Sequence, residues 1–90
     1  MLERTVRVVN QLGLHARAAA QLVKLSRCFN SGITLHRSDG SAEADTRSIL
    51  DVLALAAPLN TTLLLRADGP DEGKAIEAAA DLFEAGFGEL

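Results

Sequence analysis

The sequence predicts an α+β fold of two layers, in which a four-stranded, mostly antiparallel sheet is covered on one face by three helices. Two kinds of apolar spacing alternate along the chain: every second residue, as in strands, and every third or fourth residue, as in amphipathic helices. A tight-turn sequence, Ser38-Asp39-Gly40, joins two of the strands into a hairpin. Each expected helix has one apolar stripe, which suits packing on one face of a sheet. The element order is βαββαβα.

The four strands are expected from alternating apolar and polar residues, at residues 5–9, 33–37, 41–45 and 61–67. In the first strand, Val6 and Val8 share one face. The last strand has the most regular pattern, with Leu63, Leu65 and Ala67 facing inward. The third has weak β propensity and is placed by the turn that precedes it rather than by its own residues.

The three helices are expected at residues 16–29, at residues 48–57, and in a last segment that opens within residues 68–72 and is closed by Gly86. Pro58 helps to stop the second helix, and Pro70 with the acidic residues beside it suits the start of the third. The apolar stripe of the first helix consists of Ala18, Leu22, Leu25 and Phe29. The buried stripe of the third consists of Ala75, Ile76, Ala79, Leu82 and Phe83.

Composition restricts the classes of function. With 90 residues the chain is expected to form one domain, residues 1–90. The net charge is −3 and the pI is near 5.2, so no basic field is expected to draw the protein to nucleic acid. The apolar runs are too short for membrane insertion, and the single cysteine, Cys28, gives no internal disulfide and no metal quartet. We therefore expect a cytoplasmic protein with no metal and no cofactor.

Catalytic motifs are absent: there is no G-x-S-x-G, no Walker loop and no H-E-x-x-H. The chain has two histidines, the residue type that titrates nearest to neutral pH. His36 falls on the polar side of its strand and is interpreted as a solvated surface residue. His15 is therefore the candidate for chemistry.

His15 lies between a break at Gly13 and the first turn of an amphipathic helix. A helix start has unpaired backbone N–H groups and the positive end of the macrodipole, which together bind phosphate-like anions. An imidazole there has a nucleophilic nitrogen beside a site for the phosphoryl group, and Arg17 is near enough to contact phosphoryl oxygens. Both the helix start and Arg17 favour the neutral imidazole. Locally, two hypotheses stand: a simple helix cap, or a phosphoryl acceptor.

The wider sequence favours the second hypothesis. Residues 13–19, GLHARAA, resemble the active-site signature of the histidine-containing phosphocarrier proteins (HPr) of the bacterial sugar phosphotransferase system, typically G-[IL]-H-A-R-P-A. Residues 47–50, RSIL, resemble the family's K-S-I-M segment, and the likeness covers the whole chain. The resemblance implies an open-faced β-sandwich. It also implies that His15 takes a phosphoryl group on Nδ1 from phosphorylated enzyme I and passes it to enzyme IIA, while Arg17 stabilises the transferring group.

The same resemblance implies roles for residues outside this signature. Ser48 matches the regulatory serine that an ATP-dependent HPr kinase/phosphorylase modifies in many bacteria, although a serine before an apolar helical run is also an ordinary N-cap. Lys24 and Arg27 match basic positions that meet acidic partner surfaces. Three apolar residues match the family's docking patch for partners: Ile49, Leu50 and Leu53. The alternative for the two basic residues is a solvated helix face, and the alternative for the three apolar residues is ordinary core packing.

Two residues depart from the family pattern. Ala18 replaces a proline that pre-sets the first helical turn, which is expected to soften the site modestly. Asp51 replaces a Gly or Lys and brings negative charge near Ser48, which disfavours a phosphate or an acidic partner there.

The sequence leaves alternatives to a sugar-system carrier. Carriers of the nitrogen-related phosphotransferase system have similar sequences, and a mainly regulatory HPr-like protein is a further alternative. A small-ligand or RNA-binding module is disfavoured because no exposed strand aromatics are evident for base stacking. Catalysis on a small substrate is disfavoured because the sequence has no acid/base pair. We expect a monomeric carrier that is phosphorylated by a partner rather than an enzyme.

Overall fold

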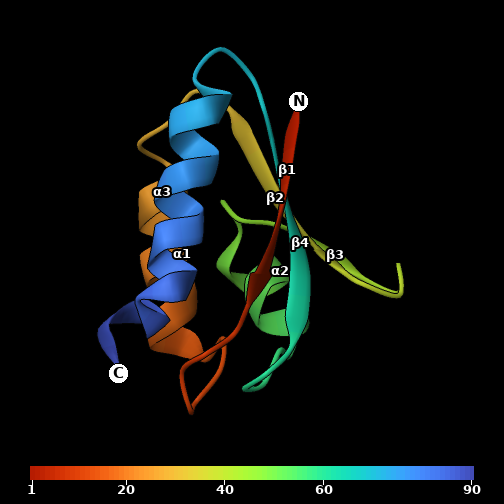
Figure 1. The fold of residues 1–90 in the computed structure, drawn as a ribbon, viewed down its shortest axis with the longest axis vertical. Helices are drawn as coiled ribbons and strands as arrows, with labels where there is room; N and C mark the ends of the chain where they lie inside the picture. Colours follow the sequence, from red (N-terminus) through yellow and green to blue (C-terminus); the bar gives the residue numbers. More distant parts are fainter.

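Four strands form one antiparallel sheet with the spatial order β1-β4-β2-β3, and the computed structural model describes residues 1–90. Figure 1 shows α1 and α3 side by side on one face of the sheet. The predicted α+β fold and its βαββαβα order are confirmed, with a short 3-10 helix, η1, added after the last helix. In chain order the elements are β1 (Leu2–Arg7), α1 (Ala16–Ser26), β2 (Gly32–Arg37), β3 (Glu43–Asp45), α2 (Ile49–Ala54), β4 (Thr62–Asp68), α3 (Glu72–Glu84) and η1 (Gly86–Gly88).

The hydrophobic core lies between the sheet and the helices, because every second strand residue points to the helical side. Val6 of β1 lies opposite Leu63 of β4, and Leu35 of β2 lies opposite Leu65; all four are buried. Each helix contributes to the same core; the contributors include Ala18, Ala19 and Leu22 of α1, Val52 of α2, and Ala75, Ala79 and Phe83 of α3. None of the helices has both the length and the apolar composition needed to cross a membrane.

Several element boundaries differ from the sequence-based prediction. β1 begins at Leu2 rather than at residue 5, since its first residues pair with β4 although their exposed side chains show no alternation. α1 ends before Phe29, which is half-buried beyond the helix. In α3 the predicted Leu82 is only half-buried, and Ala80 is buried instead. The third strand and the second helix are shorter than predicted; the chain leaves α2 through Ala56, which has a left-handed φ of 48°.

The entry to α1 depends on Gly13. Its φ is +70°, and a Cβ at this position would lie 2.5 Å from the carbonyl oxygen of Ala57. The next residue, Leu14, is buried, and its amide donates to the same carbonyl at 3.0 Å. A glycine is therefore required for the backbone to pass this close to the segment after α2 and to present His15 at the start of α1.

The C-terminal residues return to the start of α1, as Figure 1 shows at the end marked C. Three consecutive residues, Gly86, Phe87 and Gly88, have positive φ values of 60°, 55° and 75°. The Phe87 ring is buried and packs edge-on against Phe83, with ring centroids 5.0 Å apart. This turn places Glu89, the next residue, beside His15.

Candidate functional site

His15 is the N-cap residue of α1. Its backbone is extended, its carbonyl accepts the first helical hydrogen bond from Ala19 at 2.8 Å, and its ring nitrogen Nδ1 accepts the amide of Arg17 at 3.3 Å. The imidazole thus occupies the place that a serine or aspartate side chain usually takes at a helix start. Because the first turn of α1 contains no acidic residue, the positive end of the helix is not neutralised from within.

The other ring nitrogen of His15 contacts a carboxylate from the far end of the chain. Nε2 lies 2.5 Å from Oε2 of Glu89, and the second oxygen of Glu89 accepts a hydrogen bond from Nδ2 of Asn10 at 3.1 Å. Asn10 is fully buried and also donates to the carbonyl of Gly13 at 2.8 Å. These two acceptors orient the amide of Asn10 so that its NH2 group faces the site.

The contacts of the ring assign its tautomer. Hydrogen bonds, the larger effect from Asn10 and the next from His15, lower the pKa of Glu89 below its ordinary value, against the opposing effect of burial. An ionised carboxylate only accepts hydrogen bonds, so Nε2 of His15 carries the proton. A backbone amide only donates, so Nδ1 presents its lone pair to Arg17. The ring nitrogen that carries the lone pair is therefore Nδ1, at the start of α1.

His15 lies between two recesses, with 29% of its side chain exposed. On one side a recess is lined by Gln11, Arg17 and Glu89 together with Leu12 and Ala16. On the other side a mainly apolar recess is lined by Leu12, Leu14, Leu53, Ala56, Ala57 and Pro58. The imidazole is therefore reachable from outside, with a cationic side chain on one flank and an apolar surface on the other.

This arrangement can accept and hold an anionic group. The bond between Nδ1 and the Arg17 amide is long, so a group that bonds to Nδ1 displaces little, and the amide is then free to donate to that group. The Arg17 side chain is exposed and forms no ion pair, which leaves its guanidinium available to a phosphoryl oxygen. No cluster of three or more His, Cys, Asp or Glu side chains is arranged to hold a metal ion.

Ser48 is the N-cap of α2, as its position before an apolar run predicts. Its Oγ accepts the amide of Asp51 at 3.3 Å. Ser48 and Asp51 have the spacing of a capping box, but only half of it forms, because the Asp51 carboxylate accepts the amide of Asp45 at 3.3 Å rather than that of Ser48. The neighbouring Arg47 turns away and donates to the carbonyl of Phe29 at 2.8 Å, beyond the end of α1.

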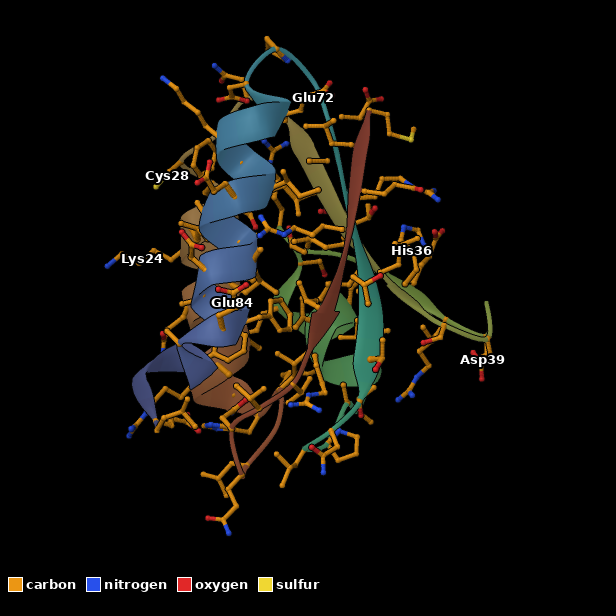
Figure 2. The ribbon with its side chains drawn as sticks, in the orientation of Figure 1. Lys24, Cys28, His36, Asp39, Glu72 and Glu84 are labelled. Carbon is orange, nitrogen blue, oxygen red and sulfur yellow. The ribbon has the colours of Figure 1, made fainter.

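The residues that the sequence predicts for partner docking lie on α1 and α2, and most of them are away from His15. Lys24 and Arg27 are exposed on α1, with Lys24 roughly 13 Å along the helix axis from His15; Figure 2 shows the Lys24 side chain pointing away from the molecule. Ile49 and Leu50 are 40% and 76% exposed on α2. The structure brings only Leu53 to the edge of the site, where it is half-buried in the apolar recess.

His36 lies on the face of the sheet opposite the helices, as Figure 2 shows, but the interpretation of a solvated residue is wrong. Only 17% of its side chain is exposed. Its Nε2 is hydrogen-bonded to Thr34 Oγ1 at 2.9 Å, and its Nδ1 lies 3.3 Å from Glu43. The ring is thus held by Thr34 of its own strand and Glu43 of the paired strand β3, and alternation along one strand does not reveal the second contact.

Sequence reasoning missed Glu89 and Asn10. Neither residue belongs to a local pattern that includes His15. Glu89 is 74 positions away along the chain, and Asn10 lies in a loop without periodicity. One signal was present in the sequence, since Gly86 and Gly88 flank an aromatic residue after the last helix. That pattern indicates a turn and a buried anchor, which together send the chain back toward the body of the protein.

Comparison with known proteins finds similar sequences and structures. The family model PTS-HPr, described as the PTS HPr component phosphorylation site, matches residues 2–85. The chain is 42% identical over 89 residues to the phosphocarrier protein HPr of Cupriavidus necator, covering 99% of this chain and 98% of that protein. It is 35% identical over 88 residues to the phosphocarrier protein NPr of Escherichia coli K12, covering 98% and 97%.

Two solved structures from Thermoanaerobacter tengcongensis resemble the whole fold. HPr-C-His superposes with a TM-score of 0.92 at 36% identity, over 100% of this chain and 99% of that one. A structure described as an HPr dimer superposes with a TM-score of 0.73 at 37% identity, over 99% and 100%. The likeness therefore covers the sheet, the helices and the segment that carries His15.

Proposed function

We propose that this chain, which belongs to the HPr family of phosphocarrier proteins, carries a phosphoryl group on Nδ1 of His15 between a donor protein and an acceptor protein. HPr proteins are carriers rather than catalysts, so the enzyme that phosphorylates His15 is a partner. The observation that carries the proposal is the Nδ1 lone pair at the start of α1, beside the unpaired guanidinium of Arg17. Phosphoryl transfer requires a nucleophile, positioning and compensation of charge, and these groups supply all three.

The proposed partners are enzyme I as donor and enzyme IIA as acceptor in the cytoplasm, with residues 1–90 acting as a monomeric domain. The nitrogen-related system is the second candidate, and it is supported by the 35% identity to NPr over nearly the whole chain. The two candidates share the chemistry at His15 and differ in the proteins that dock beside it.

We propose that partners dock on the apolar surface next to the site. Support comes from the exposure of Leu12, Ile49 and Leu50, at 70%, 40% and 76%, and from the apolar recess that joins Leu53 to His15. Apolar surface of this kind marks interfaces when it is contiguous. Lys24 and Arg27, exposed on α1, are proposed to meet acidic groups of the same partners and to speed association more than they tighten it.

Ser48 is proposed as a regulatory phosphorylation site for a kinase of the HPr kinase/phosphorylase type. Its position beside Ile49 and Leu50 supports this role, because a phosphate there adds charge to the proposed docking surface. Incubation with such a kinase and ATP should label the wild-type protein and leave Ser48→Ala unlabelled. Failure to label the wild type at Ser48 rejects regulation at this residue without affecting the role of His15.

The carrier function is tested by incubation with phosphoenolpyruvate and a generic enzyme I. The wild type should acquire an acid-labile, alkali-stable phosphate, and His15→Ala should acquire none. His36→Ala is the matched control, because it removes the other imidazole of the chain and should keep the label. Label on His15→Ala, or none on the wild type, would contradict the proposal.

A further inference from the structure

We infer that Glu89 is a positioning residue for this transfer: it keeps the proton of His15 on Nε2 and balances the positive charge that the ring gains when Nδ1 is phosphorylated. The inference rests on the proposed function of His15 and adds a residue 74 positions away in the chain. It assigns a function to the C-terminal turn, which otherwise only ends the fold.

The Glu89 carboxylate is held firmly enough to act in this way. Its side chain is only 15% exposed, and its two oxygens have different partners: Oε2 faces Nε2 of His15 at 2.5 Å, and Oε1 accepts from Asn10 at 3.1 Å. Asn10 is itself fixed by burial and by its bond to Gly13. A charge-assisted hydrogen bond in partly excluded solvent is stronger than the same bond in water.

The backbone before Glu89 is built to bring it back to the site. Phe87 has a φ of 55°, which is unfavourable for a residue with a Cβ and persists only where packing compensates it. That compensation is visible: Phe87 is 2% exposed, its ring packs against Phe83, and its carbonyl accepts a hydrogen bond from Gln21 of α1 at 3.0 Å. The turn is therefore tied to α3 and to α1, the helix that His15 begins.

The transfer step balances with Glu89 in this role. The Nδ1 lone pair forms the bond to phosphorus, and the donor's bond to phosphorus breaks, with its electron pair remaining on the donor atom. No proton has to leave, because Nε2 keeps the proton that it already shares with Glu89. The ring becomes a phosphorylated imidazolium with a positive charge, next to a carboxylate that is already ionised. The reverse sequence returns the ring to its starting tautomer when the acceptor takes the phosphoryl group.

Two substitutions separate the two parts of this role. Glu89→Gln keeps a neutral acceptor for Nε2 but removes the charge, and it should slow phosphoryl acceptance from enzyme I by about ten- to a hundredfold. Glu89→Ala removes the acceptor, and the ¹⁵N resonances of the His15 ring in the free protein should move from a pure Nε2–H tautomer toward a mixture of the two. Glu84→Gln is the matched control: this glutamate is exposed on α3, as Figure 2 shows, and should change neither measurement.

The inference is overturned if Glu89→Gln accepts phosphate at the wild-type rate, or if Glu89→Ala leaves the ring resonances of His15 unchanged. A merely structural role for Glu89 predicts a change in stability without a change of tautomer, so the resonances distinguish the two. Failure of the wild type to accept phosphate at all would instead reject the proposed function. The tautomer measurement needs no donor enzyme, so in that case it still decides whether Glu89 holds the proton on Nε2.

Discussion

The starts of α1 and α2 are capped in the same manner but differ in charge. At each start a side-chain atom accepts a backbone amide at 3.3 Å: Nδ1 of His15 from Arg17, and Oγ of Ser48 from Asp51. The first turn of α1 has no acidic residue, whereas that of α2 contains Asp51. At α1 the nearby carboxylate is that of Glu89, which contacts Nε2, the ring nitrogen of His15 that does not cap the helix. Capping is thus common to both helix starts, and they differ in where the negative charge lies: inside the first turn of α2, but beyond the imidazole at α1.

The strongest way to break this comparison is to displace the start of α1 alone. Gly13→Ala adds a Cβ that would lie 2.5 Å from the Ala57 oxygen, at a φ of +70°. We expect a loss of about 3 kcal/mol in the free energy of unfolding, together with reduced phosphoryl acceptance, because the backbone must move where it presents His15. Denaturant titration measures the loss of stability.

A second glycine serves as the control for that substitution. Gly40 has a similar φ of +75°, but a Cβ there would meet nothing within 4 Å. Gly40→Ala should therefore cost only about 1 kcal/mol, from the left-handed backbone alone. Equal costs for the two substitutions would show that the close approach of Gly13 to Ala57 does not matter.

Removing the cation of the α1 start should weaken transfer without weakening the fold. Arg17→Ala is expected to slow phosphoryl acceptance about ten- to a hundredfold, since it removes charge-assisted hydrogen bonds to the transferring group. The unfolding midpoint should change little because the Arg17 side chain is exposed and unpaired. Arg4→Ala, an exposed arginine on β1, removes the same charge elsewhere and should leave the rate unchanged.

The difference in charge can also be exchanged between the two helices. Ala16→Asp places an acid in the first turn of α1 and should stabilise the fold by about 0.5 kcal/mol while slowing phosphoryl acceptance about fivefold. Asp51→Asn removes the acid from α2 and should destabilise the fold by a similar amount without changing acceptance at His15. Thermal unfolding and the rate of labelling are measured on both variants. In Ala16→Asp the unfolding temperature should rise while the rate of labelling falls, and in Asp51→Asn only the unfolding temperature should fall. A faster rate of phosphoryl acceptance in Ala16→Asp would contradict the comparison.

The smallest expected effect is the response of the α1 start to acid. The pKa of Glu89 is lowered in the folded state, chiefly by the hydrogen bond from Asn10. Its stabilising contribution is therefore complete above its unfolded value of 4.5 and is lost as the pH falls through the lower folded value. As the pH falls below 4.5, Glu89→Gln should therefore lose less stability than the wild type. Glu84→Gln should follow the wild type, and a parallel loss in Glu89→Gln would mean that the contact is absent in solution.

Periodicity was sufficient to predict most of the fold, and it failed where exposure or a turn overrode the pattern. Leu63, Leu65 and Ala67 are buried as predicted, because a central strand packs one face against helices. The first residues of β1 were missed because an edge strand with exposed side chains shows no alternation. Phe29 was assigned to α1 because it continues the apolar spacing, although the chain has already turned.

The candidate site was predictable only in its local half. His15 and Arg17 belong to one helix start, so their proximity follows from the sequence order. The contact of Glu89 with His15 depends on the packing of Phe87 against Phe83 and on three left-handed residues, and no local pattern specifies where such a turn ends. Asn10 was missed for the same reason, since its role is defined by the acceptors that the fold brings to it.

The central claim is that the phosphoryl group occupies the ring nitrogen at the start of α1. Heteronuclear NMR of the ¹⁵N-labelled, phosphorylated protein tests it by correlating the phosphorus with the two ring nitrogens of His15. We predict coupling of phosphorus to Nδ1, with the proton retained on Nε2. Phosphorus bonded to Nε2, or to any residue other than His15, would contradict the account.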